Sequence, residues 1–178
     1  MKTYFILSAF GKDRPGIVAD VAEVIYECRG NIEDSSMGCL RSHFALLVLF
    51  SMEEKGIQEL PPRLKQLERE KGLTVFYSPV TLQDIRPAPQ EALPRYRITT
   101  SGVDQTGIVF RVCRFLADGG INIVDMETRR ISSAESGTPL FEMDMEVEVP
   151  KSVTDQALRE DLHHLANELV IDLVLKRL

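Results

Sequence analysis

The chain has 178 residues and a net charge of −6, from 21 lysines and arginines against 27 aspartates and glutamates. Because no basic block or arginine–aromatic pattern accompanies this acidic balance, the sequence disfavours direct binding of nucleic acid. The three cysteines have no CxxC spacing, which predicts reduced thiols and a cytoplasmic protein. The N-terminal apolar run is too short to predict a membrane span.

The first half of the chain predicts six elements in the order β-α-β-β-α-β. Apolar residues recur at helical spacing after a glycine-containing loop and again from Leu60, where Pro61 and Pro62 fit the first turn of a helix. The predicted elements span residues 4–10, 17–28, 31–39, 42–52, 60–67 and 73–82. This order is that of the ferredoxin-like fold, an antiparallel sheet with both helices on one face.

The second half repeats this pattern after a proline-containing segment. The segment QDIRPAPQEALP has three prolines and little apolar content, which predicts a semi-extended linker. We expect a first domain at residues 1–84, a linker at 85–94 and a second domain at 95–178. Elements of the second domain are predicted over residues 96–101, 108–116, 121–131, 140–149, 153–165 and 169–178. The predicted fold class is α+β, with two ferredoxin-like domains.

The two predicted sheets differ in the faces that they show to solvent. In the second copy, FEMDMEVEV alternates apolar and acidic residues from Phe141 to Val149, as in a sheet with one wet face. In the first copy, FALLVLF at residues 44–50 is apolar on both sides. We therefore expect the helix-free face of the first sheet to be covered, either by the other domain or by another subunit.

The repeat is clearest in two loops that join the first strand of each copy to its first helix. GKDRPGIVADV contains the first loop (residues 13–16), and GVDQTGIVFRV contains the second loop (residues 104–107). In one interpretation, Asp13 and Asp104 cap the two helices, and Pro15 fits a first helical turn. In the other, Gly16 and Gly107 indicate that a packed strand or a ligand comes close to the backbone. The N–H groups at such a helix start can bind a carboxylate.

An asparagine opens the strand that follows each of these helices. The amides of Asn31 and Asn122 carry both a donor and an acceptor, and could bind an ammonium and a carboxylate together. The alternative is that both are turn residues, which follow left-handed helix caps at Gly30 and at Gly119–Gly120.

The motifs DRPGIV and DQTGIV, with NI opening the next strand, resemble the ACT domain, a module that binds amino acids. Two copies over nearly the whole chain resemble the glycine cleavage system transcriptional repressor family. The resemblance implies ligand sites at domain or subunit interfaces, formed by Asp13, Arg14, Pro15, Gly16, Ile17, Asn31, Ile32, Asp104, Gln105, Thr106, Gly107, Ile108, Asn122 and Ile123. Because Gln105 and Thr106 replace Arg14 and Pro15, the two loops need not bind the same ligand.

The sequence contains few residues in the spacings that catalytic or metal-binding motifs require. The three histidines form no pair at i, i+4 spacing, and Cys28 and Cys113 lie on helix faces that predict burial. We expect a non-catalytic homodimer without a cofactor or metal, which senses a small amino acid such as glycine or serine. It would act through a protein partner, for example a DNA-binding regulator of glycine and one-carbon metabolism. The alternatives are a constitutive interaction scaffold and a small acyl-phosphate hydrolase that uses Arg111.

Overall fold

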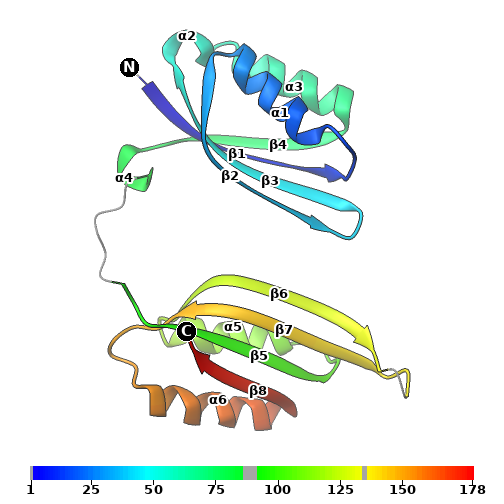
Figure 1. The fold of residues 1–178 in the computed structure, drawn as a ribbon, viewed down its shortest axis with the longest axis vertical. Helices are drawn as coiled ribbons and strands as arrows, with labels where there is room; N and C mark the ends of the chain where they lie inside the picture. Colours follow the sequence, from blue (N-terminus) through cyan, green and yellow to red (C-terminus); the bar gives the residue numbers. More distant parts are fainter. Residues whose placement is uncertain (1, 86–91, 134–135) are drawn as a thin grey trace. The chain divides into compact units, whose positions relative to one another are not determined.

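The structure, a computed structural model, describes residues 2–85, 92–133 and 136–178. It divides into two compact units, residues 1–90 and 91–178, each with a four-stranded antiparallel sheet and helices on one face (Figure 1). The predicted linker at residues 85–94 falls largely on residues 86–91, which lie outside the described residues. The prediction of an α+β chain with two ferredoxin-like folds is confirmed.

The first unit contains the six predicted elements and two further short helices. Its elements are β1 (Lys2–Lys12), α1 (Ile17–Glu27), β2 (Gly30–Leu40), β3 (His43–Glu53), α2 (Glu54–Ile57), α3 (Leu60–Lys71), β4 (Leu73–Val80) and α4 (Leu82–Ile85), with sheet order β2-β3-β1-β4. The last strand was predicted to reach Leu82 but ends at Val80. The chain turns there because Thr81 donates to the Asp84 carboxylate from its backbone N–H at 2.9 Å and its hydroxyl at 2.6 Å.

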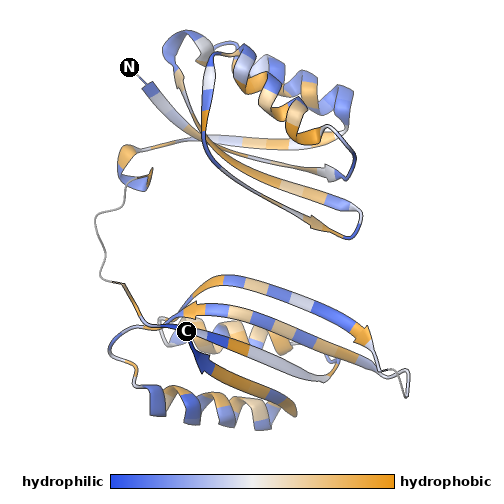
Figure 2. Cartoon of the chain, viewed as in Figure 1, coloured by the Kyte–Doolittle hydropathy of each residue, from blue (hydrophilic) through white to orange (hydrophobic). Residues whose placement is uncertain are grey.

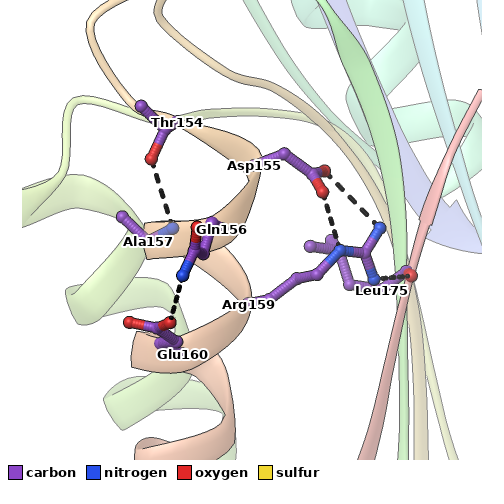
Figure 3. Close-up of polar contacts among 7 residues, drawn as sticks. All are labelled: Thr154, Asp155, Gln156, Ala157, Arg159, Glu160 and Leu175. Atoms are coloured by element: carbon purple, nitrogen blue, oxygen red, sulfur yellow. Dashed lines mark hydrogen bonds and ion pairs between the residues drawn. The ribbon is translucent and has the colours of Figure 1, made fainter.

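The second unit repeats the topology without the short helices among its described residues. Its elements are β5 (Arg95–Val103), α5 (Ile108–Asp118), β6 (Asn122–Ser132), β7 (Pro139–Glu148), α6 (Asp155–Leu169) and β8 (Ile171–Arg177), with sheet order β6-β7-β5-β8. At the start of α6, the Thr154 hydroxyl accepts the Ala157 N–H at 3.2 Å (Figure 3). One turn on, Arg159 donates to Asp155 at 2.8 Å and to the Leu175 carbonyl at 3.0 Å. The same arginine therefore ties α6 to β8.

Each unit has its own hydrophobic core between the sheet and the helices. In the first, Phe5 and Phe50 stack with ring centroids 5.5 Å apart beneath α1 and α3. In the second, Met143 and Met145 of β7 point into the core while Asp144 between them faces away, so the predicted alternation in β7 is confirmed. Each fully buried apolar side chain of this size contributes about 1.5–3 kcal/mol to the free energy of folding.

The helix-free face of the first sheet is apolar, as the sequence of β3 predicts. On this face Phe10, Leu47 and Phe76 are 47%, 46% and 63% exposed within the described residues. Figure 2 shows the difference along the strands, since β3 is mostly apolar while β7 alternates. No helix in the described ranges is both long and apolar enough to cross a membrane.

Candidate functional site

The first loop leads from β1 into α1 without a side-chain cap. Gly16 is the N-cap residue, with φ 91° and ψ −3°, and no side chain accepts a hydrogen bond from the first helical turn. The interpretation that Asp13 caps this helix is wrong, because Gly16 is the N-cap residue and the Asp13 carboxylate makes no cap hydrogen bond. The backbone N–H of Asp13 donates to the Ser42 carbonyl at 2.9 Å. Pro15 likewise precedes the helix rather than occupying its first turn. Backbone N–H groups at the start of α1 are therefore not used by a capping side chain.

The two loop glycines have a conformational role rather than a close neighbour. Gly107 has φ 100°, and a Cβ added there would meet no atom within 4 Å, while at Gly16 it would meet only the Arg14 guanidinium at 3.8 Å. The expectation of a packed strand against the backbone at these positions is therefore wrong, and that of a ligand stays a prediction. Close approach occurs earlier in the same repeat, where a Cβ on Gly11 or Gly102 would lie 2.8 or 2.9 Å from the neighbouring strand.

An ion-pair network holds Arg14 beside the start of α1. Its guanidinium donates to the Asp20 carboxylate at 2.6 Å and to the Pro15 carbonyl at 3.2 Å. Lys71, at the end of α3, lies 3.0 Å from the other oxygen of the same carboxylate. Hydrogen bonds from Arg14 and Lys71 lower the pKa of Asp20 below its ordinary value. Sequence reasoning missed Asp20, although its place one turn into the predicted helix was a usable signal.

A shallow hollow of about 320 Å³ adjoins the first loop. It is lined by the loop, the first turn of α1, and the side chains of Met37 and Phe44 from the sheet. The carboxylate of Asp13 is exposed and makes no hydrogen bond or ion pair with the described part of the chain. The Arg14 guanidinium, which is also paired with Asp20, the Asp13 carboxylate and the uncapped N–H groups of α1 therefore surround a space of the size that binds small molecules.

Two polar side chains of the second loop, Asp104 and Gln105, are engaged within their own unit. The Asp104 carboxylate, which also fails to cap its helix, pairs with Arg130 of β6 at 2.8 Å. Gln105 donates to the Leu169 carbonyl at the end of α6. Arg111 lies inside α5 and pairs with Glu168, so it does not line the loop as the hydrolase alternative requires. Thr106 is exposed and Ile108 is buried, as Ile17 is in the first unit.

The predicted asparagines lie at the opposite end of each sheet from the loops. Asn31 of β2 pairs with Ser51 of β3, which pairs in turn with Tyr4 near the start of β1. The loop follows Lys12, at the other end of β1. Eight residues of strand separate these levels, a distance of about 26 Å. Asn122 pairs with Glu148, which pairs in turn with Arg95 at the start of β5, so the second unit has the same arrangement. The fold therefore does not bring Asn31 and Ile32, or Asn122 and Ile123, to the loop of the same unit.

The local surroundings of these asparagines differ in part from the turn interpretation. The Asn31 amide donates to Glu33 at 3.4 Å. The left-handed residue after α1 is Arg29, with φ 58°, so a left-handed cap at Gly30 is wrong. A Cβ on Gly30 would instead lie 2.8 Å from the Ile25 side chain. After α5, the expected left-handed glycine is present as Gly120, with φ 66°.

The three cysteines differ in burial and lie apart in sequence. Cys28 is buried, Cys39 is exposed and Cys113 is half-buried, and all three are free thiols. Among residues 2–85, 92–133 and 136–178, no three histidine, cysteine or acidic side chains are placed to hold a metal ion.

Comparison with known proteins supports one family. The ACT domain family model matches residues 3–78. A UPF0237 protein of Methanopyrus kandleri is 36% identical over 76 residues, which cover 42% of this chain and 84% of that protein. The glycine cleavage system transcriptional repressor of Escherichia coli K12 is 22% identical over 93% of this chain and 85% of its own length. A solved structure from Galdieria sulphuraria is 27% identical and matches with a TM-score of 0.78 over 100% of this chain and 99% of that one. The first unit therefore belongs to the ACT domain family, the second unit repeats its ferredoxin-like fold in tandem, and the chain as a whole resembles the glycine cleavage system transcriptional repressors.

Proposed function

We propose that this chain is a non-catalytic, cytoplasmic regulator that binds a small amino acid at the first loop and acts through a protein partner as a homodimer. The membership of its first unit in the ACT family and the similarity of the chain to the Escherichia coli glycine cleavage system transcriptional repressor support this function. Glycine and serine are the favoured ligands, in control of glycine and one-carbon metabolism. Because the net charge of −6 disfavours contact with nucleic acid, transcriptional control would pass through a DNA-binding partner.

The difference between the two Asp side chains carries the proposal that the first loop is the working site. Asp13 is exposed and unpaired among the described residues, whereas Asp104 is neutralised by Arg130. At the first loop, the N–H groups of α1 and the Arg14 guanidinium can receive a carboxylate, and Asp13 can receive an ammonium. An amino acid presents these two charges together, so it fits the chemistry of this loop better than a simple anion.

The expected affinity limits how open the site can be. Glycine has about five non-hydrogen atoms, so the best possible binding free energy is about −7.5 kcal/mol, a dissociation constant of a few micromolar. A helix start contributes about 0.3–2 kcal/mol of this. The rest requires enclosure beyond the shallow hollow, which a second copy of the fold would supply. Asn31 lies at the far end of its own sheet and is not part of the proposed site.

Thermal unfolding against a panel of single amino acids tests the proposal. At about 100 times its dissociation constant, a ligand stabilises the folded state by about 2.7 kcal/mol, which raises the midpoint by about 5–10 °C. We expect a rise with one or two amino acids that is lost in Asp13→Asn. Asp104→Asn is the matched control and should keep the rise. If Asp104→Asn alone abolishes it, the second loop is the site.

The constitutive scaffold is the second candidate, and the apolar sheet face of the first unit favours it. In that case, no amino acid in the panel would change the unfolding midpoint. A partner protein would then bind equally well with and without every amino acid tested.

A further inference from the structure

The helix-free side of the first sheet, here called the open face, carries no charged side chain on its central strands β1 and β3 between Ile6 and Phe10, while Asp34 lies on its edge strand β2. The strand register places Ile6 opposite Leu49, Ser8 opposite Leu47 and Phe76, and Phe10 opposite Ala45 on this face. The same positions in the second unit carry charges, including the pair formed by Arg97 and Asp144 at 3.5 Å. Burial of that second face would require costly desolvation of charged groups, whereas burial of the two central strands of the open face would not.

The open face has a ridge beside a hollow. Phe10 of β1 and Phe76 of β4 form the ridge, with stacked rings whose centroids are 6.3 Å apart. Next to the ridge, a hollow of about 440 Å³ lies over the small residues Gly38 and Ala45 and beside Leu47. A ridge and a hollow side by side on one surface can complement a second copy of the same surface.

We propose that the open face binds the open face of a second copy of this chain across a two-fold axis parallel to the strands. The register defines a row across the sheet, in which Gly38, Ala45, Phe10 and Thr74 stand side by side on β2, β3, β1 and β4. A two-fold axis through the middle of this row places the aromatic ridge of each copy over the hollow of the other. It also places Gly38 of one copy opposite Thr74 of its partner.

The size of the face fits a dimer that dissociates on dilution. Four strands about 4.8 Å apart and about eight residues long give a footprint of about 500 Å² on each copy. The two copies together bury about 1,000 Å², which is the lower end for a specific interface. An amino acid is a poor occupant, because hydroxyls are the only polar side-chain groups at the centre of this face. The inference rests on the proposed homodimer but not on amino-acid binding.

Sedimentation of the full chain without added ligand is the first test. At about 100 µM the wild type is expected to sediment as a dimer, with twice the chain mass of 20.1 kDa. Leu47→Arg places like charges in the interface and should give a monomer with an unchanged far-ultraviolet circular dichroism spectrum. Val174→Arg, at a 62% exposed position on the charged face of the second sheet, is the matched control and should remain dimeric.

Chemical cross-linking tests the geometry without disturbing the ridge. In a Cys39→Ser background, Gly38→Cys and Thr74→Cys chains are mixed with a bis-maleimide of about 10 Å span, the spacing of stacked sheets. We expect a cross-linked dimer from the mixture and not from either chain alone. Both positions are open, since a Cβ on Gly38 meets no atom within 4 Å and Thr74 is exposed.

The outcomes separate this inference from the proposed function. A monomeric wild type would overturn both the homodimer and the open-face interface. A Leu47→Arg protein that stays dimeric, or cross-linking of each single variant with itself as well as in the mixture, would overturn the interface alone. The amino-acid proposal is judged independently by thermal unfolding and can fail while the interface stands.

Discussion

Replacement of the two loop glycines by alanine tests the reasoning about the helix starts. Gly16 and Gly107 are left-handed, with φ 91° and 100°, and an added Cβ has space at both. The cost of Gly16→Ala and Gly107→Ala is therefore backbone strain alone, about 1–2 kcal/mol for each residue. With a urea slope of about 2 kcal/mol/M, each midpoint falls by about 0.5–1 M.

Gly38→Ala is the matched control for this experiment, which is run at a protein concentration low enough for the chain to be monomeric, because Gly38 lies in the proposed interface. Gly38 has neither a left-handed φ nor an atom within 4 Å of an added Cβ. Alanine there restricts the unfolded chain, so the protein should be unchanged or more stable by about 0.4–1 kcal/mol. Urea unfolding followed by circular dichroism measures all three variants. If the loop variants lose no more stability than Gly38→Ala, the strain argument is incorrect.

Three further predictions concern a cap, a carboxylate and the thiols. Thr154→Ala removes the N-cap bond of α6 and should cost about 1 kcal/mol in urea unfolding, whereas Thr154→Ser should cost less. Asp20→Asn should be less stable than wild type by up to about 1 kcal/mol at pH 7. Because the folded pKa of Asp20 is lowered, this difference should shrink in urea titrations as the pH falls below about 4. Burial raises the pKa of the Cys28 and Cys113 thiols, so mass spectrometry should find maleimide on Cys39 first.

The element order was predictable because long amphipathic segments repeat with a clear period. Helices α2 and α4 were not, since four residues are too few to show helical periodicity. The cap at Asp13 was predicted from a residue preference, but a sequence preference does not fix which residue adopts the cap conformation. Here Gly16 adopts it in a left-handed form.

Only those residues of the candidate site that are close together in the sequence could be predicted. The first loop and its repeat are contiguous in sequence, so their residues were found together. The pairing of Asp104 with Arg130 depends on contacts between distant strands, and no local pattern shows it. The separation of Asn31 from its own loop follows from strand direction. Strands β1 and β2 are both antiparallel to β3, so they run in the same direction. The loop follows the end of β1 and Asn31 opens β2, so the two motifs lie at opposite ends of the sheet.

The salt bridges between the paired helices have opposite polarity in the two units. Asp20 of α1 meets Lys71 of α3, while its repeat counterpart Arg111 of α5 meets Glu168 of α6. If a helix folded onto the wrong sheet, Asp20 would face Glu168 and Arg111 would face Lys71. Both mispairings place like charges together, which disfavours them. The charge reversal thus protects a duplicated chain against exchange of homologous helices while it folds, a common failure of tandem repeats.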